Sequence, residues 1–194
     1  ISRMKLLIVL LLVGSASAQS AAFVTKFQNL VTNYLGANTV KAVDMIGQDA
    51  LQLKTIDEMV SHLMKEVIGL VPASKYMGAL GMLTNFQSCM SKAGSSMEKA
   101  MANIGAAFKG KLQPLYKKVI DKIKTMKTNK KADKAILTEG FKIATAGLTK
   151  ALIQSVINVC MTKSTKAEYD CATPALNTIM VTSNYNMAYD AKRG

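Results

Sequence analysis

The sequence predicts an all-α fold, a single-domain helical bundle of about six to eight helices that follows a cleaved signal peptide. Apolar residues recur every three or four positions through most of the chain, which is the period of an amphipathic helix. No segment alternates cleanly between apolar and polar residues, and the Asn-Gly turns typical of β-hairpins are missing. Apolar residues make up 49% of the 194 residues, so the chain can bury a core of its own.

Residues 1–18 have the pattern of an upstream remnant followed by a secretory signal peptide. Met4 is the expected start, Lys5 supplies a positive charge, and residues 6–13 form an apolar run. Small residues follow, and this order is typical of a signal that is cleaved, here after residue 18. The apolar run is too short to span a bilayer; an N-terminal anchor helix is the alternative. We therefore expect a secreted, extracellular protein whose helical domain covers residues 19–194.

Four helices are expected in the first half of the chain. Apolar residues at helical spacing predict helices over residues 23–35 and 40–53, the first of them ended by a glycine. Residues 55–58, Thr-Ile-Asp-Glu, form a capping box, in which the two outer side chains satisfy free amides of the first turn. This box begins a third helix, which Pro72 ends, and a fourth helix is expected over about 74–93.

Four more helices are expected in the second half. A capping box at residues 95–98 begins a fifth helix, which ends around Gly110. A sixth helix begins near Pro114, because proline is favoured in the first helical turn. A seventh covers about 132–160 with a break near one of its glycines, and a last helix follows Pro174. The two glycines at which the break is expected are Gly140 and Gly147.

The positive charge is concentrated in a basic segment, residues 99–134. The whole chain carries a net charge of +13, and this segment holds eleven lysines against only Asp121 and Asp133. Its basic residues are all lysine, whereas arginine is the better reader of base edges, so we do not expect sequence-specific nucleic-acid binding. Lysine suits an anionic membrane or a polyanionic glycan surface, and solubility alone is the alternative explanation.

The expected sixth helix is amphipathic and basic. On a helical wheel its apolar residues, from Leu115 to Met126, fall within an arc of about 140°. This pattern predicts either a membrane-surface helix or a bundle helix whose apolar side lies in the core. The lysines of the opposite side can contact an anionic surface or pair with the carboxylate of a ligand. These anionic-surface candidates are Lys117, Lys118, Lys122 and Lys124.

Methionine is the second unusual feature of the chain. Apart from Met4, twelve of its 13 methionines follow the signal segment. Methionine is flexible and polarisable, so a Met-rich helical interior suits a pocket for a fatty acid, retinoid or sterol-like ligand. An ordinary core built from the same residue is the alternative. The candidate ligand-binding residues are Met59, Leu63, Met64, Met82, Met101, Tyr116, Ile120 and Ile123.

The three cysteines fit an oxidising compartment, and one disulfide between two of them leaves one thiol unpaired. We expect a disulfide between Cys160 and Cys171, because the segment between them is short, polar and suited to a turn. Cys89 is then a buried free thiol, or it joins a second chain in a disulfide-linked dimer. The alternative pairing joins Cys89 to either partner and connects distant helices.

The sequence holds no catalytic, metal or cofactor motif, so we expect no enzyme, no metal site and no cofactor. His62 is the only histidine, and the cysteine spacings do not match a zinc module. The leading hypothesis is a secreted protein that binds a small hydrophobic ligand for transport or sequestration. The alternatives are a membrane-active or polyanion-binding effector that uses the basic segment, and an extracellular structural or interaction protein.

Overall fold

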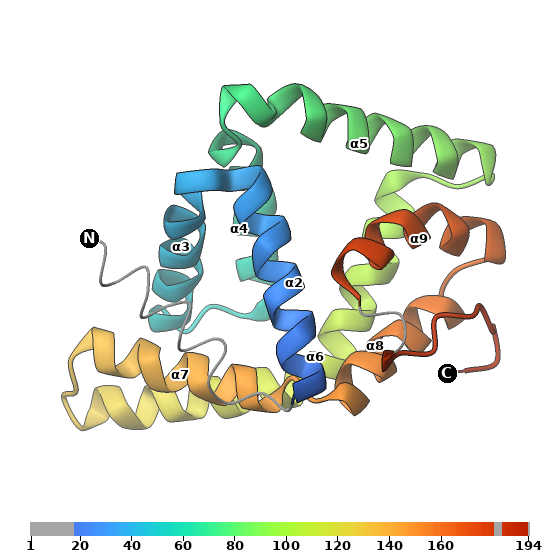
Figure 1. Cartoon of the computed structure of the whole chain (residues 1–194). Helices are drawn as coiled ribbons and strands as arrows, with labels where there is room; N and C mark the ends of the chain where they lie inside the picture. Colours follow the sequence, from blue (N-terminus) through green and yellow to red (C-terminus); the bar gives the residue numbers. More distant parts are fainter. Residues whose placement is uncertain (1–17, 181–183, 194) are drawn as a thin grey trace.

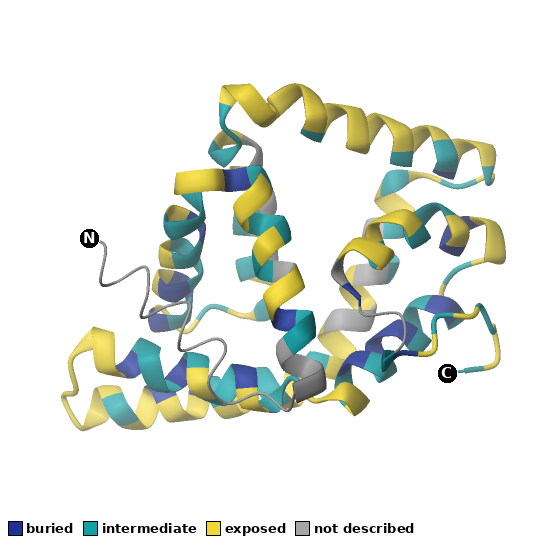
Figure 2. Ribbon diagram, viewed as in Figure 1, coloured by how far each residue is buried: buried dark blue, intermediate teal, exposed yellow. Residues whose placement is uncertain are grey.

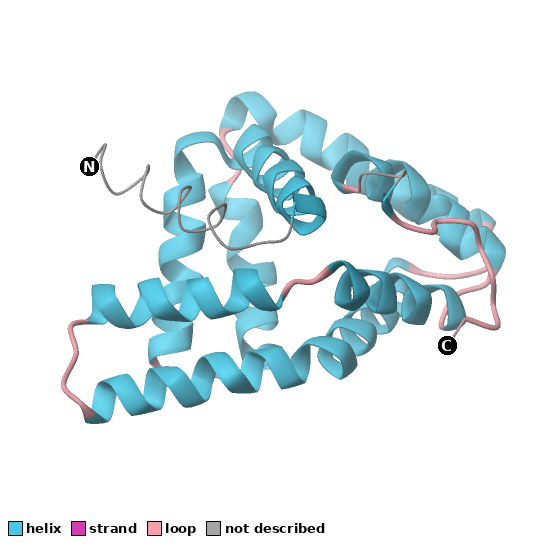
Figure 3. Ribbon diagram, turned by 60° about the horizontal axis from the view of Figure 1, so that its bottom comes forward, coloured by secondary structure: helices cyan, strands magenta, loops and turns pink. Residues whose placement is uncertain are grey.

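The computed structural model describes residues 18–180 and 184–193, without the side chains at positions 18–21, 27, 60, 64, 67, 68, 101, 104, 107, 108 and 179. Within this part the chain is all-helical, as the sequence predicts, and has no strand (Figures 1 and 3). Residues 1–17, which hold most of the expected signal segment, lie outside it. The helices are α2 (Ala18–Leu35), the 3-10 helix η1 (Gly36–Asn38), α3 (Thr39–Leu51), α4 (Ile56–Leu70), α5 (Ala73–Lys92), α6 (Met97–Thr128), α7 (Asp133–Gly147), α8 (Lys150–Thr162) and α9 (Lys166–Ile179).

The long helix α6 connects two groups of helices. Its C-terminal half lies antiparallel to α7, and α3 and α4 stand side by side against this pair (Figure 1). α8 and α9 pack together near the other half of α6, and α2 contacts both α3 and α9. α5 runs from the end of α4 to the start of α6, across the side opposite α7 (Figure 1). Figure 2 shows that α5 is exposed along most of its length.

α6 is a single helix of 32 residues, whereas the sequence predicts two helices separated between Gly110 and Pro114. Pro114 lies inside α6 and has no N–H, which leaves the carbonyl of Gly110 without its helical partner. Both residues are exposed, so water can satisfy this carbonyl, and the helix bends instead of ending. Figures 1 and 3 show the change of direction. The predicted break at this point is therefore wrong.

Capping residues explain where α4 and α6 begin. The Thr55 N–H donates to Glu58 Oε2 (2.7 Å) and the Glu58 N–H donates to Thr55 Oγ (3.3 Å), so the predicted capping box of α4 is confirmed. At α6 the capping residue is Ser96, one position later than predicted. Its hydroxyl accepts a hydrogen bond from the N–H of Lys99 (3.2 Å).

The break between α7 and α8 follows Gly147, one of the two glycines at which it is predicted. Thr149 caps α8 by accepting a hydrogen bond from a backbone N–H of the first turn. The last helix starts earlier than predicted, because Thr165 and Glu168 form a capping box and Pro174 lies inside α9. In the described residues no single helix is long and apolar enough to cross a membrane; α7 and α8 meet those requirements only as a pair, bent by 70° at their break.

Two hydrophobic cores hold the helices together. One lies between α8, α9 and the C-terminal segment, and the other lies between α3, α6 and α7 (Figure 2). The amphipathic arc predicted for residues 115–126 is buried in the second core, where Ile123 is only 1% exposed. The first core contains Ile153, Ile157, Met161, Tyr169, Met180 and Tyr185, and the second contains Leu51, Ile120, Ile123 and Ile136.

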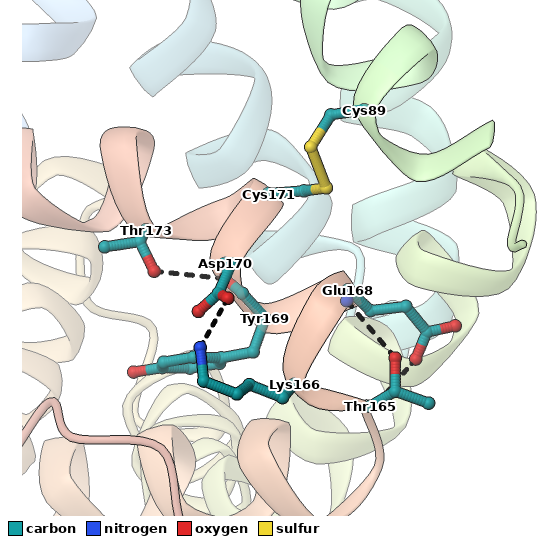
Figure 4. The surroundings of a disulfide bond; sticks show 8 residues. All are labelled: Cys89, Thr165, Lys166, Glu168, Tyr169, Asp170, Cys171 and Thr173. Carbon is teal, nitrogen blue, oxygen red and sulfur yellow. Dashed lines mark hydrogen bonds and ion pairs between the residues drawn. A yellow bond between two sulfur atoms is a disulfide. The ribbon is translucent and has the colours of Figure 1, made fainter. Parts of the chain in front are cut away.

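A disulfide joins Cys89 of α5 to Cys171 of α9 (Figure 4). The predicted Cys160–Cys171 pair is therefore wrong, because α9 begins at Lys166 and its cysteine meets α5 instead of α8. The Cys89 thiol, on which the predicted disulfide-linked dimer depends, is bonded to Cys171 in this structure. Cys160 is the free cysteine of the described residues, and its burial raises the pKa of its thiol. The alternative pairing, which connects distant helices, is the one that forms.

Glu168 links the start of α9 to α6 beside this disulfide (Figure 4). It is buried, accepts a hydrogen bond from the Thr165 N–H (2.7 Å), and forms an ion pair with Lys99 (2.9 Å). The neighbouring Ser95 side chain, the Thr165 amide and Lys99 together lower the pKa of Glu168 from 4.5 to about 2. The ionised carboxylate therefore stabilises the folded chain.

The disulfide predicts a large and specific loss of stability in the double variant Cys89→Ser/Cys171→Ser. The two cysteines are 82 residues apart, and a loop of that length corresponds to about 4 kcal/mol in the loop-entropy model. We expect urea unfolding to show a loss of up to about 4 kcal/mol. Cys160→Ser is the matched control, with an expected change below about 1 kcal/mol. Peptide mapping that finds Cys160 bonded and Cys89 free would contradict the structure.

Glu168 predicts a stability difference that depends on pH. The full lowering of its pKa corresponds to about 3 kcal/mol, and solvent screening near Lys99 reduces the expected difference to about 1–2 kcal/mol. Because the folded pKa is lowered, this contribution is present above pH 4.5 and is lost as the pH falls towards 2. Urea unfolding of Glu168→Gln at several pH values measures it. A difference that stays constant between pH 7 and pH 2.5 would count against the assignment.

Candidate functional site

The candidate site is a cavity of about 340 Å³ between α3, α4, α6 and α7. It lies beside the second hydrophobic core, where these four helices meet (Figure 1). The cavity is partly open, and its walls are almost entirely apolar. The described residues that line it are Ile46, Gly47, Ala50, Ile56, Met59, Leu63, Leu112, Leu115, Tyr116, Val119, Ile123, Leu137, Gly140, Phe141, Ala144 and Leu148.

Small residues on α3 and α7 create this space. Gly47 and Ala50 lie one turn apart on α3, and Gly140 and Ala144 do so on α7. A Cβ atom at Gly140 would lie 3.5 Å from Val119 and would narrow the cavity. Gly47 of α3 thus lies close to Leu137 of α7, and Gly140 of α7 lies close to Val119 of α6. These small residues leave room between the larger side chains.

Gly147, at the end of α7, is needed for the same close approach. A Cβ atom there would lie 2.1 Å from Leu115 Cδ1, which is far inside normal contact distance. Leu115 is itself a lining residue, so its position depends on this glycine. The glycine that separates α7 from α8 thus also shapes one wall of the cavity.

Among the described lining residues, Tyr116 is the one with a side-chain hydroxyl. Its hydroxyl donates a hydrogen bond to the backbone carbonyl of Lys54 and lies 3.2 Å from the sulfur of Met59. Burial, together with the nearby carboxylates of Glu58 and Asp49, raises the pKa of Tyr116. The phenol therefore stays protonated and neutral.

A cluster of three charged or titratable side chains joins α3 to α4 next to the cavity. Asp49 is buried; its carboxylate lies 2.5 Å from Lys54 Nζ and 2.7 Å from His62 Nδ1. Burial raises the pKa of Asp49, but hydrogen bonds from Lys54 and His62 outweigh this effect, and the pKa lies below its usual value. This cluster holds the end of α3 against α4 and thereby supports the cavity wall at Ala50 and Met59.

Half of the predicted ligand-binding residues line the cavity: Met59, Leu63, Tyr116 and Ile123. Ile120 lies in the adjacent core with Leu51 instead. Met82 lies on α5, is 51% exposed, contacts the Tyr34 hydroxyl, and is not among the described residues that line the cavity. The side chains of Met64 and Met101 lie outside the described residues.

The sequence prediction missed the wall formed by α3 and α7. The signal that marks it is the series of small residues Gly140, Ala144 and Gly147, which share one side of α7 at spacings of four and three. Leu112 was missed as a lining residue because it lies within the break expected between Gly110 and Pro114. Leu115 was placed on the apolar arc of the expected sixth helix but not among the ligand-binding candidates.

The four predicted anionic-surface lysines are all exposed, and none of them lines the cavity. Lys117 forms an ion pair with Asp121 one turn away (2.6 Å). Lys122 borders a second, wide and open groove at the turn between α6 and α7, together with Lys131 and Lys134. The predicted pairing of these lysines with the head group of a bound ligand does not fit this placement.

Comparison with protein-family models, curated proteins and solved structures finds no significant match to this chain. Within residues 18–180 and 184–193, no group of three or more His, Cys, Asp or Glu side chains is arranged to hold a metal ion. The cavity and the charged surface are therefore the features of this chain that indicate a function.

Proposed function

We propose that this protein is a secreted binder of a small hydrophobic ligand, which it transports or sequesters. The observation that carries the proposal is the apolar cavity of about 340 Å³ between four helices. Ligand sites in proteins are concave, mostly apolar spaces of about 300–1,000 Å³ with a small number of placed polar groups. The cavity lies near the lower end of this range and suits one small molecule.

Because the cavity is partly open, its apolar walls are exposed to water when it is empty. An apolar ligand removes that surface from water. Occupation of the cavity therefore stabilises the folded state.

Binding is driven by the transfer of apolar surface out of water. Each Å² of apolar surface that becomes buried contributes about 25 cal/mol. α4 contributes Met59 and Leu63 to the lining, and α6 contributes Leu112 and Leu115, so a ligand contacts several helices at once. The flexible thioether of Met59 can adapt to the shape of the ligand.

The disulfide supports the extracellular part of the proposal. Cys89 and Cys171 are bonded, and structural disulfides persist in oxidising compartments. The hypothesis of an interaction protein relied on a free Cys89 thiol that joins a second chain. Cys89 is bonded to Cys171, so it does not supply that thiol. A covalent dimer would have to use Cys160, which is partly buried.

A second candidate function, binding to a polyanion or an anionic membrane, is favoured by one observation. The end of α6, the turn that follows it and the start of α7 carry six lysines, three of which line the open groove. We call this group the basic end. Positive charge concentrated in this way attracts sulfated glycans and anionic lipid headgroups. The basic end consists of Lys122, Lys124, Lys127, Lys130, Lys131 and Lys134.

Ala144→Leu tests the ligand-binding proposal directly. Ala144 lines the cavity, and a leucine there adds bulk where the ligand is expected. We expect fluorescence titration with the neutral probe N-phenyl-1-naphthylamine to give a Kd raised by about tenfold or more.

Ala146→Leu is the matched control, because Ala146 is exposed on the same helix and lies outside the cavity wall. Its affinity for the probe should equal that of the unaltered chain. Thermal unfolding by circular dichroism shows that both variants are folded. If the two variants have equal affinities, whether normal or reduced, the probe does not bind in this cavity and the proposal is contradicted.

The second candidate predicts that heparin binding depends on the position of the lysines and not only on their number. Replacing Lys122, Lys131 and Lys134 together by glutamine should lower the salt concentration that elutes the protein from a heparin column. If a control with the same loss of charge shows a similar fall in the eluting salt concentration, net charge alone explains heparin binding and the second candidate is contradicted. The control replaces three exposed lysines of α3, α4 and α5 by glutamine, namely Lys41, Lys65 and Lys75.

A further inference from the structure

The charges beside the cavity disfavour an acidic ligand. Glu58 and Asp49 are the two carboxylates that raise the pKa of Tyr116 in addition to its burial, so both act at the polar group of the wall. The Asp49 carboxylate faces Lys54 and His62, which offset its charge. Glu58 is held at the start of α4 by the Thr55 N–H and has no such pair of partners among the described residues. A ligand carboxylate bound near Tyr116 would meet the like charge of Glu58.

The described residues that line the cavity include no Lys, Arg or His, so the wall itself offers no cation to a bound carboxylate. The ammonium of Lys54 lies 2.5 Å from Asp49 and is already paired with it. Lys117 and Lys118 of α6 are exposed and are not part of the wall. A carboxylate inside the cavity would lose its water without gaining a partner, which is strongly unfavourable.

The hydroxyl of Tyr116 has one proton, which already takes part in a hydrogen bond. It donates to the backbone carbonyl of Lys54, which leaves the lone pairs of the phenolic oxygen as acceptors. An ionised carboxylate can only accept hydrogen bonds, so it does not match this group. The hydroxyl of an alcohol can donate to the phenolic oxygen and therefore matches it.

On the basis of the proposed function, we infer that the cavity selects a neutral apolar alcohol, with a long-chain or ring hydrocarbon body, over an acidic lipid. The hydrocarbon body fills the space between α3, α4, α6 and α7. The ligand hydroxyl donates to Tyr116, which orients the molecule at the end nearest Lys54 and Met59. Tyr116 orients the ligand, and the Glu58 carboxylate, together with the lack of a cation in the described lining, disfavours anions.

The test uses three probes with the same twelve-carbon chain: dodecan-1-ol, methyl dodecanoate and dodecanoate. Each probe displaces N-phenyl-1-naphthylamine from the full chain at pH 7.5, below the concentration at which the probe forms aggregates. In Tyr116→Phe we expect the affinity for dodecan-1-ol to fall severalfold, because the acceptor is lost. The affinity for methyl dodecanoate should not change, since this ester has no proton to donate. That unchanged value also shows that the variant is folded.

A second variant tests the exclusion of anions. Glu58→Gln removes one carboxylate and keeps a side chain that can cap α4. We expect its affinity for dodecanoate to rise severalfold, whereas its affinity for dodecan-1-ol stays the same.

The possible outcomes distinguish a failure of this inference from a failure of the proposed function on which it rests. Normal binding of N-phenyl-1-naphthylamine with tighter binding of dodecanoate than of dodecan-1-ol would overturn the inference and leave the cavity as a ligand site. An unchanged affinity for dodecan-1-ol in Tyr116→Phe would also overturn it. If N-phenyl-1-naphthylamine and all three probes fail to bind the unaltered chain, the proposed function itself is wrong and the inference falls with it.

Discussion

Burial of the apolar side of α6 is the interaction on which the rest of the structure depends. α6 contacts α3, α4, α5, α7 and α8, so most of the described helices take their position from it. In its second half Ile120 and Ile123 enter the core shared with α3 and α7. In its first half Lys99 pairs with Glu168, and Asn103 donates to the carbonyl of Lys163 (2.8 Å), which ties α6 to the region of α8 and α9. The exposed side of the same helix carries the lysines, so one element supports both candidate functions.

The cavity follows from how α3, α4 and α7 pack against that apolar side. Gly140 and Gly147 let the α7 backbone approach α6, yet small residues cannot fill the space between the larger side chains. Next to the cavity, Asp49 joins α3 to α4 through its contacts with Lys54 and His62. A buried charge cluster of this kind is costly to form and is disrupted when one partner is lost. The wall is thus built from well-fixed helices, which favours a site that exists before the ligand arrives.

Much of the fold was predictable because its signals are local. The capping box at Thr55 and the amphipathic arc around Ile123 depend on neighbours in sequence, and both predictions are confirmed. Periodicity shows which side of α6 faces inwards, but it cannot tell that Tyr116 borders a cavity while Ile120 lies in a filled core. The Cys89–Cys171 bond and the site at Gly140 depend on which helices meet, and sequence spacing carries no information on that. Pro114 shows the limit of a local rule, because an exposed helix can bend at a proline and continue.

Native mass spectrometry of the protein purified from its own source, without reductant, tests the central claim most directly. The account predicts a monomer with one disulfide that carries the added mass of one small neutral apolar molecule. On denaturation that mass should leave, and solvent extraction should recover an alcohol instead of a carboxylic acid. A bare chain that also takes up no neutral probe, although circular dichroism shows it to be folded and helical, would contradict the account. In that case the lysines of the basic end, and not the cavity, would be the place to look for its function.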